Sequence, residues 1–130
     1  MAFDQTNILD RPGESLDHDE TDGLISSEKV DGTAVYNRQG ERLGSIHHLM
    51  VGKRDGRVRY AVMNFGGILG IGERYHPLPW DVLTYDTDMG GYSVDLDKER
   101  LEGAPSFERG QEPAYDRVYA ERIGGFYGRI

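Results

Sequence analysis

Three histidines are the side chains most able to bind a metal ion in this 130-residue sequence. His47 and His48 are adjacent, and His76 lies between a tyrosine and a proline. Neighbouring side chains of a strand point to opposite faces, so His47 and His48 can bind the same ion only if the strand bulges between them. We predict no metal ligand and no cofactor here, and keep a small-ligand or metal-binding sensor built on the three histidines as the alternative function.

Residues 86–97 superficially follow a calcium-binding loop, with Asp86 and Asp88 at its first and third positions. The twelfth position holds Asp97, which is shorter than the bidentate glutamate such a loop needs, and the flanking residues have strand character. We therefore expect a hairpin turn in which aspartate side chains accept hydrogen bonds from backbone amides.

No residue pattern points to catalysis. Gly67, Gly70 and Gly72 occur in the order G-x-x-G-x-G and are followed by prolines, so they do not form a dinucleotide-binding fingerprint. The chain has no cysteine and no G-x-S-x-G nucleophile motif. We predict no catalytic residue and no enzymatic activity.

Short apolar and β-branched runs, separated by turn-forming pairs, follow one another from Leu24 onward. This spacing is typical of a small all-β barrel. The expected strands cover residues 33–36, 43–52, 57–65, 75–78, 83–85 and 92–96, and a short helix over 97–101 follows them. Pro77 and Pro79 confine their strand to a sheet edge or the barrel opening, because proline lacks a backbone N–H.

The two longest strands are expected to form a hairpin. Asp55-Gly56 between them suits a two-residue type I′ turn. Ile46 differs in parity from Leu49 and Val51, so the three cannot share one face of a regular strand. A bulge at His47 or His48 would restore the register and bend the sheet.

The C-terminal segment predicts a contact surface. Pro113 suits a helix start and Gly124-Gly125 a helix end, and apolar side chains, Val118 among them, fall on one stripe between. A helix of about ten residues does not persist alone in water, so it must dock on the barrel or on another subunit. The predicted partner-binding residues are Tyr115, Tyr119, Ile123, Phe126 and Tyr127. The aromatic and apolar residues expected in the core are Tyr60, Trp80 and Leu83.

Residues 1–31 contain nine acidic and two basic side chains, and so account for most of the net charge of −8. Such a segment buries little apolar surface, and residues 1–23 are predicted to form a disordered tail. The excess of acidic over basic side chains opposes binding to the phosphates of a nucleic acid. No apolar run approaches the roughly 18 residues of a membrane span, and no signal peptide is apparent. We expect a cytoplasmic protein without membrane insertion.

Residues 24 to about 103 resemble a PRC-barrel domain, the small β-barrel found in the photosynthetic reaction-centre H subunit and in a bacterial ribosome-maturation factor. The resemblance rests on the runs GERLGSI at 40–46, RYAV at 59–62, GILGIG at 67–72 and PLPW at 77–80. It implies a free-standing bacterial member that acts as an adaptor for other proteins and carries no reaction chemistry.

The sequence therefore predicts three parts: an acidic tail over 1–23, a PRC-like barrel of about six short strands over 24–103, and an extension with a short amphipathic helix over 104–130. A barrel of this size is only marginally stable alone, and oligomerisation is a common remedy. We expect a non-catalytic protein-interaction module whose partners are a second copy of itself and an unidentified protein.

Overall fold

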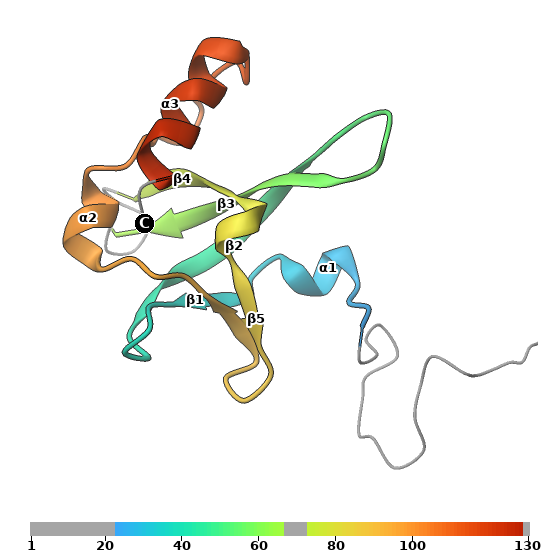
Figure 1. The fold of residues 1–130 in the computed structure, drawn as a ribbon, viewed down its shortest axis with the longest axis vertical. Helices are drawn as coiled ribbons and strands as arrows, with labels where there is room; N and C mark the ends of the chain where they lie inside the picture. Colours follow the sequence, from blue (N-terminus) through green and yellow to red (C-terminus); the bar gives the residue numbers. More distant parts are fainter. Residues whose placement is uncertain (1–22, 67–72, 129–130) are drawn as a thin grey trace, which may run out of the picture. The chain divides into compact units, whose positions relative to one another are not determined.

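The structure is a computed structural model that describes residues 23–66 and 73–128 (Figure 1). The chain separates after Val30 into two compact units. In the first unit, the short helix α1 (Ser27–Val30) follows Ser26, whose backbone carbonyl accepts hydrogen bonds from Lys29 and Val30. The predicted disordered tail lies outside the described residues except for Gly23, and so do Gly67, Gly70 and Gly72.

The second unit is built on a six-stranded sheet, which confirms the all-β prediction (Figure 1). Its strands are β1 (Ala34–Tyr36), β2 (Arg42–Val51), β3 (Val58–Phe65), β4 (Arg74–Pro79), β5 (Thr84–Asp86) and β6 (Gly91–Ser93). They are ordered β4-β3-β2-β1-β6-β5, and every neighbouring pair is antiparallel except β1 and β6. β6 ends before the predicted residue 96: the Leu96 N–H bonds back to the Val94 carbonyl at 3.0 Å instead of to a neighbouring strand, and both residues are buried.

The β2–β3 hairpin is confirmed, but its loop is longer than predicted. The Gly52 N–H donates to the Arg57 carbonyl at 2.7 Å, so four residues lie between the closing pair instead of two. Asp55 shapes this loop by accepting hydrogen bonds from the Arg57 backbone and the Arg59 side chain. Gly56 adopts a φ of 70°, a conformation that favours glycine.

The predicted bulge is confirmed at His47. Ile46 pairs with Met63 and His48 pairs with Val62, so His47 is the extra residue of β2. A second irregularity lies between Met50 and Val51, where Arg59 is the extra residue of β3; Val51, the last residue of β2, is exposed, whereas Ile46 is buried. Each irregularity adds local twist, which bends the long strand.

The six described strands do not close into a complete barrel, because β4 and β5 do not pair with each other. The outer edge of β4 is already occupied. The backbone N–H and carbonyl of Tyr75 bond with those of Phe107 at 2.9 and 3.0 Å. Pro77 and Pro79 follow at two-residue intervals on the same edge and have no N–H to offer. The predicted small barrel is thus formed in the described residues by a six-stranded sheet that has two edges.

Both faces of the β3–β4 ladder are covered. The consecutive residues Ala61, Val62 and Met63 are all buried, although neighbouring strand residues point to opposite faces. Val62 packs with Tyr75 and Phe107, and the rings of these two aromatic residues are stacked 5.6 Å apart. The core thus depends on Phe107, which lies beyond the strands.

Two helices complete the second unit. α2 (Lys98–Glu102) begins after Asp97, whose carboxylate accepts a hydrogen bond from the Arg100 amide at 2.8 Å, and its Leu101 is fully buried. α3 (Arg117–Tyr127) lies alongside β4 in Figure 1. No helix in the described part of the chain is both long and apolar enough to span a membrane.

The predicted limits of the C-terminal helix were wrong at both ends. The helix starts after Asp116, not at Pro113, because the Asp116 carboxylate accepts a hydrogen bond from the Tyr119 amide. It continues through the two glycines at 124 and 125 to Tyr127. Burial of Tyr127 one turn beyond Ile123 offsets the poor helix propensity of the glycines.

Candidate functional site

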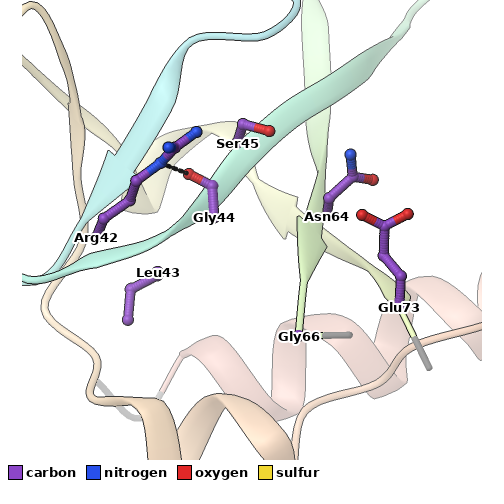
Figure 2. A pocket seen from close by; sticks show the side chains of 7 residues that line it. All are labelled: Arg42, Leu43, Gly44, Ser45, Asn64, Gly66 and Glu73. Carbon is purple, nitrogen blue, oxygen red and sulfur yellow. Dashed lines mark hydrogen bonds between the residues drawn. The ribbon is translucent and has the colours of Figure 1, made fainter. Parts of the chain in front are cut away.

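A pocket of about 270 Å³ opens where β2, β3 and β4 meet (Figure 2). Arg42, Gly44 and Ser45 line it from β2, Asn64 lines it from β3, and Glu73 immediately precedes β4. Leu43 and Gly66 complete the lining. Figure 2 shows Arg42 on one side of the pocket and Asn64 with Glu73 on the other.

The pocket carries opposite charges on its two sides. The Arg42 guanidinium donates to the Gly44 carbonyl at 3.4 Å, and the Glu73 carboxylate accepts from the Tyr75 hydroxyl at 3.4 Å. The Asn64 side-chain oxygen is buried and has no hydrogen-bond partner among the described residues. A small polar group bearing both a donor and an acceptor would satisfy these atoms.

The bulge brings His47 and His48 together on one face of the sheet. Their Nδ1 atoms are 2.8 Å apart, the distance of a hydrogen bond in which one imidazole donates to the other. The His47 ring also packs edge-on against Tyr75 at 5.1 Å. Burial and the adjacent His47 lower the pKa of His48, whereas the carboxylates of Asp31 and Glu112 act in the opposite direction.

His76 does not join this pair. It pairs with Met63 on the opposite face of the sheet from Val62 and Tyr75, and its ring contacts Phe65 at 5.4 Å. Burial, with a smaller effect of Arg74, lowers the pKa of His76 to about 4. Within residues 23–66 and 73–128, no three histidine, aspartate or glutamate side chains converge as metal ligands. The convergence of three histidines that the alternative function requires is therefore not observed in the described part of the chain.

The 86–97 segment forms the expected hairpin turn between β5 and β6. The Asp86 carboxylate accepts hydrogen bonds from the Asp88 and Met89 amides at 2.9 and 3.2 Å. Gly90 adopts a φ of 67° and its amide bonds back to the Asp86 carbonyl. The aspartate oxygen is therefore used by the turn, as the sequence predicted.

The predicted partner-binding residues of the C-terminal segment pack largely against their own chain. Tyr119, Ile123 and Tyr127 are buried, and Tyr115 and Phe126 are half-buried. Tyr115 contacts Tyr60 of β3 and Tyr119 of α3, with ring centroids 5.4 Å apart in both pairs. Val118, placed on the apolar stripe by the sequence, is 67 % exposed instead. The segment thus docks on its own sheet, one of the two options left open.

An exposed aromatic surface around the β5–β6 hairpin escaped the sequence analysis. Trp80, in the short 3-10 helix η1 (Trp80–Val82), contacts Tyr92, and Tyr92 contacts Tyr85 at 5.1 Å. Tyr85 is 37 % exposed and Met89 is 39 % exposed. Aromatic residues and methionine are enriched at protein interfaces. No local pattern distinguishes this surface, because Tyr85 lies in a three-residue strand between polar neighbours.

The three residues predicted for the core are Tyr60, Trp80 and Leu83, and each is only half-buried. Trp80 is the first residue of η1 and Leu83 follows its last residue, and no residue of η1 is buried. Tyr60 lies near the start of β3, and its ring contacts that of Tyr115. Apolar and aromatic character predicted burial of these three residues, but each keeps part of its surface exposed.

The described strands, helix α2 and the intervening turns correspond to a known domain. A family model described as PRC-barrel domain matches residues 22–101, which is more than half of the chain. No curated protein matches the chain. The matched range runs from before β1 to within α2 and contains the bulged hairpin, the pocket and the aromatic surface. On this match, the chain belongs to the PRC-barrel domain family.

Proposed function

We propose that this chain is a cytoplasmic, non-catalytic protein-interaction module that forms a homodimer and holds a further protein partner. The observation that carries the proposal is the exposure of Tyr85 and Met89 on the β5–β6 hairpin, beside the half-buried Trp80; we call these three residues the hairpin surface. Large aromatic side chains and methionine supply much of the contact area in protein interfaces.

The position of the hairpin surface supports contact with another polypeptide. β5 is the last strand of the sheet and has a strand neighbour on one side only. An edge strand can accept a strand of another chain through backbone hydrogen bonds, and the side chains around it then set the specificity. Tyr115 and Phe126 keep part of their surface exposed and stay in the proposal as secondary contacts.

The acidic balance of the chain supports a protein partner over a nucleic acid. Neutralising phosphates requires clustered lysine and arginine, whereas this chain has 23 acidic and 15 basic side chains. The alternative function, a sensor built on three histidines, is weakened because His76 lies on the other face of the sheet. We do not retain it in that form.

Sedimentation velocity of the full chain tests the proposal. We expect a concentration-dependent dimer, and we expect the variant Tyr85→Glu with Met89→Glu to sediment as a monomer, because two charges would have to be buried in the contact. The matched control is Val118→Glu, which places a charge at an exposed apolar position of α3 and should leave the dimer intact.

A wild-type chain that stays monomeric at every concentration would rule out the dimer. The further partner is tested separately. One preparation of the chain carries a photo-reactive cross-linker at residue 85, and a second preparation carries it at residue 118. Capture of a protein other than a second copy of the chain from position 85, and not from position 118, supports a further partner at the hairpin surface. Equal capture from both positions contradicts it.

A further inference from the structure

The bulge in β2 creates a pair of imidazoles that a regular strand would separate. His47 is the inserted residue, and both His47 and His48 lie on the face that carries Val62 and Tyr75. The contact with the Tyr75 ring restrains His47, and the half-buried position of His48 restrains the second ring. The two Nδ1 atoms are therefore held close by the fold and not by chance rotation of two surface side chains.

The separation of the two nitrogens identifies the kind of ion that fits. With metal–nitrogen bonds of about 2.0 Å, two ligand nitrogens lie about 2.8 Å apart at a right angle and about 3.3 Å apart at a tetrahedral angle. The Nδ1 atoms are 2.8 Å apart. This spacing matches adjacent positions of a square-planar or octahedral ion better than those of tetrahedral zinc.

The surroundings favour a cation. The carboxylates of Asp31 and Glu112 act electrostatically on His48 and stabilise positive charge beside it. His47 is exposed, so an ion can enter from solvent and keep water in its remaining positions.

We propose that His47 and His48 together chelate one divalent transition-metal ion of right-angle coordination, Cu(II) or Ni(II), through their Nδ1 atoms, with water at the remaining positions. This site is separate from the hairpin surface and uses two histidines, not the three that the sequence singled out. Small rotations of the two rings would turn both lone pairs from each other toward a common point, and the ion replaces the shared proton.

Titration of the full chain with Cu(II) and with Ni(II), followed by calorimetry and by electron paramagnetic resonance for copper, tests this site. We expect one ion per chain, hyperfine coupling to two imidazole nitrogens, and weaker binding of Zn(II). Loss of groups that merely support a metal ligand weakens binding 10–100-fold, so we expect the Kd to rise about tenfold or more in His47→Gln and in His48→Gln. The matched control, His18→Gln, removes a histidine outside the described residues and should leave the affinity unchanged.

Three results would overturn the proposal: no copper or nickel bound at submillimolar ion, unchanged affinity in the chain that carries both His47→Gln and His48→Gln, or loss of binding in His18→Gln. The melting temperature of each variant is measured alongside. If His48→Gln lowers the melting temperature, the test of the site rests on His47→Gln, since His47 is exposed. The copper spectrum of His47→Gln should show coupling to one imidazole nitrogen fewer.

Discussion

His76 shows how burial of one residue ties stability to pH. Its pKa falls to about 4 in the folded chain, mainly through burial and secondarily through Arg74, whereas an unperturbed histidine titrates at 6.5. The unfolded chain therefore binds a proton between these two values that the folded chain does not bind. The stabilising effect is fully present above pH 6.5 and is lost as the pH falls toward 4.

We expect the free energy of unfolding to drop by about 3 kcal/mol between pH 7 and pH 4 through His76 alone. Urea denaturation at several pH values in this range measures the slope. In His76→Gln, which cannot be protonated, the slope should become clearly shallower, while His18→Gln should retain it. An unchanged slope in His76→Gln would assign the acid sensitivity to other groups.

Tyr127 buries a hydroxyl that has no hydrogen-bond partner among the described residues. Burial also raises the pKa of this hydroxyl well above its ordinary value, so it stays neutral. Because an unpaired buried polar group costs about 1–3 kcal/mol, Tyr127→Phe should leave stability unchanged or raise it by about 1 kcal/mol. Tyr127→Ala removes the whole ring and should cost about 3–5 kcal/mol. Thermal or urea unfolding of both variants checks this, and a marked loss in Tyr127→Phe would reveal a partner for the hydroxyl.

At the scale of the elements, two glycines have opposite roles. Gly44 lies where β2 crosses close to β3, and a methyl group there would collide with the Asn64 backbone carbonyl. Gly125 lies within α3, with no heavy atom near an added methyl group. Gly44→Ala should destabilise the fold by about 1–3 kcal/mol, whereas Gly125→Ala should stabilise it by about 0.5–1 kcal/mol. Urea denaturation of the two variants distinguishes them, and a stabilising Gly44→Ala would contradict the close approach of the strands.

The strands were predictable because alternate residues of a strand point to opposite faces, so burial of one face fixes which positions are apolar. The mismatch between Ile46 and Leu49 located the bulge within one residue, and Pro77 with Pro79 identified an edge strand. The end of α3 was not predictable, since the local signal of two glycines is overridden by the burial of Tyr127. Local propensity cannot report a contact made with a distant strand.

The candidate sites were less accessible to sequence reasoning than the fold. Arg42, Asn64 and Glu73 come from three separate segments, and only the strand register brings them around one pocket. The pairing of His47 and His48 followed from the bulge, but the exclusion of His76 depended on which face of β4 it occupies. The hairpin surface depends on exposure, which aromatic content alone does not indicate.

For the molecule as a whole, the C-terminal segment is part of the folded unit. Phe107 extends the edge of β4, and Tyr119, Ile123 and Tyr127 are buried. Deleting residues 106–130 should therefore lower the melting temperature sharply, because the covered side of the sheet becomes exposed. Deletion of residues 1–22, which leaves every residue of the described sheet in the chain, serves as the control. Circular dichroism during heating measures both. An unchanged melting temperature after the first deletion would show that the segment adds nothing to stability.

The blocked edge of β4 limits how copies of this chain can join. Fibres that grow by strand addition need two accepting edges on every subunit, one for the copy before and one for the copy after. With prolines and Phe107 occupying one edge, the described sheet can accept a strand only at β5. When two molecules pair through β5, each uses its one open edge. Assembly by this route therefore stops at a two-fold symmetric pair and cannot continue into a filament.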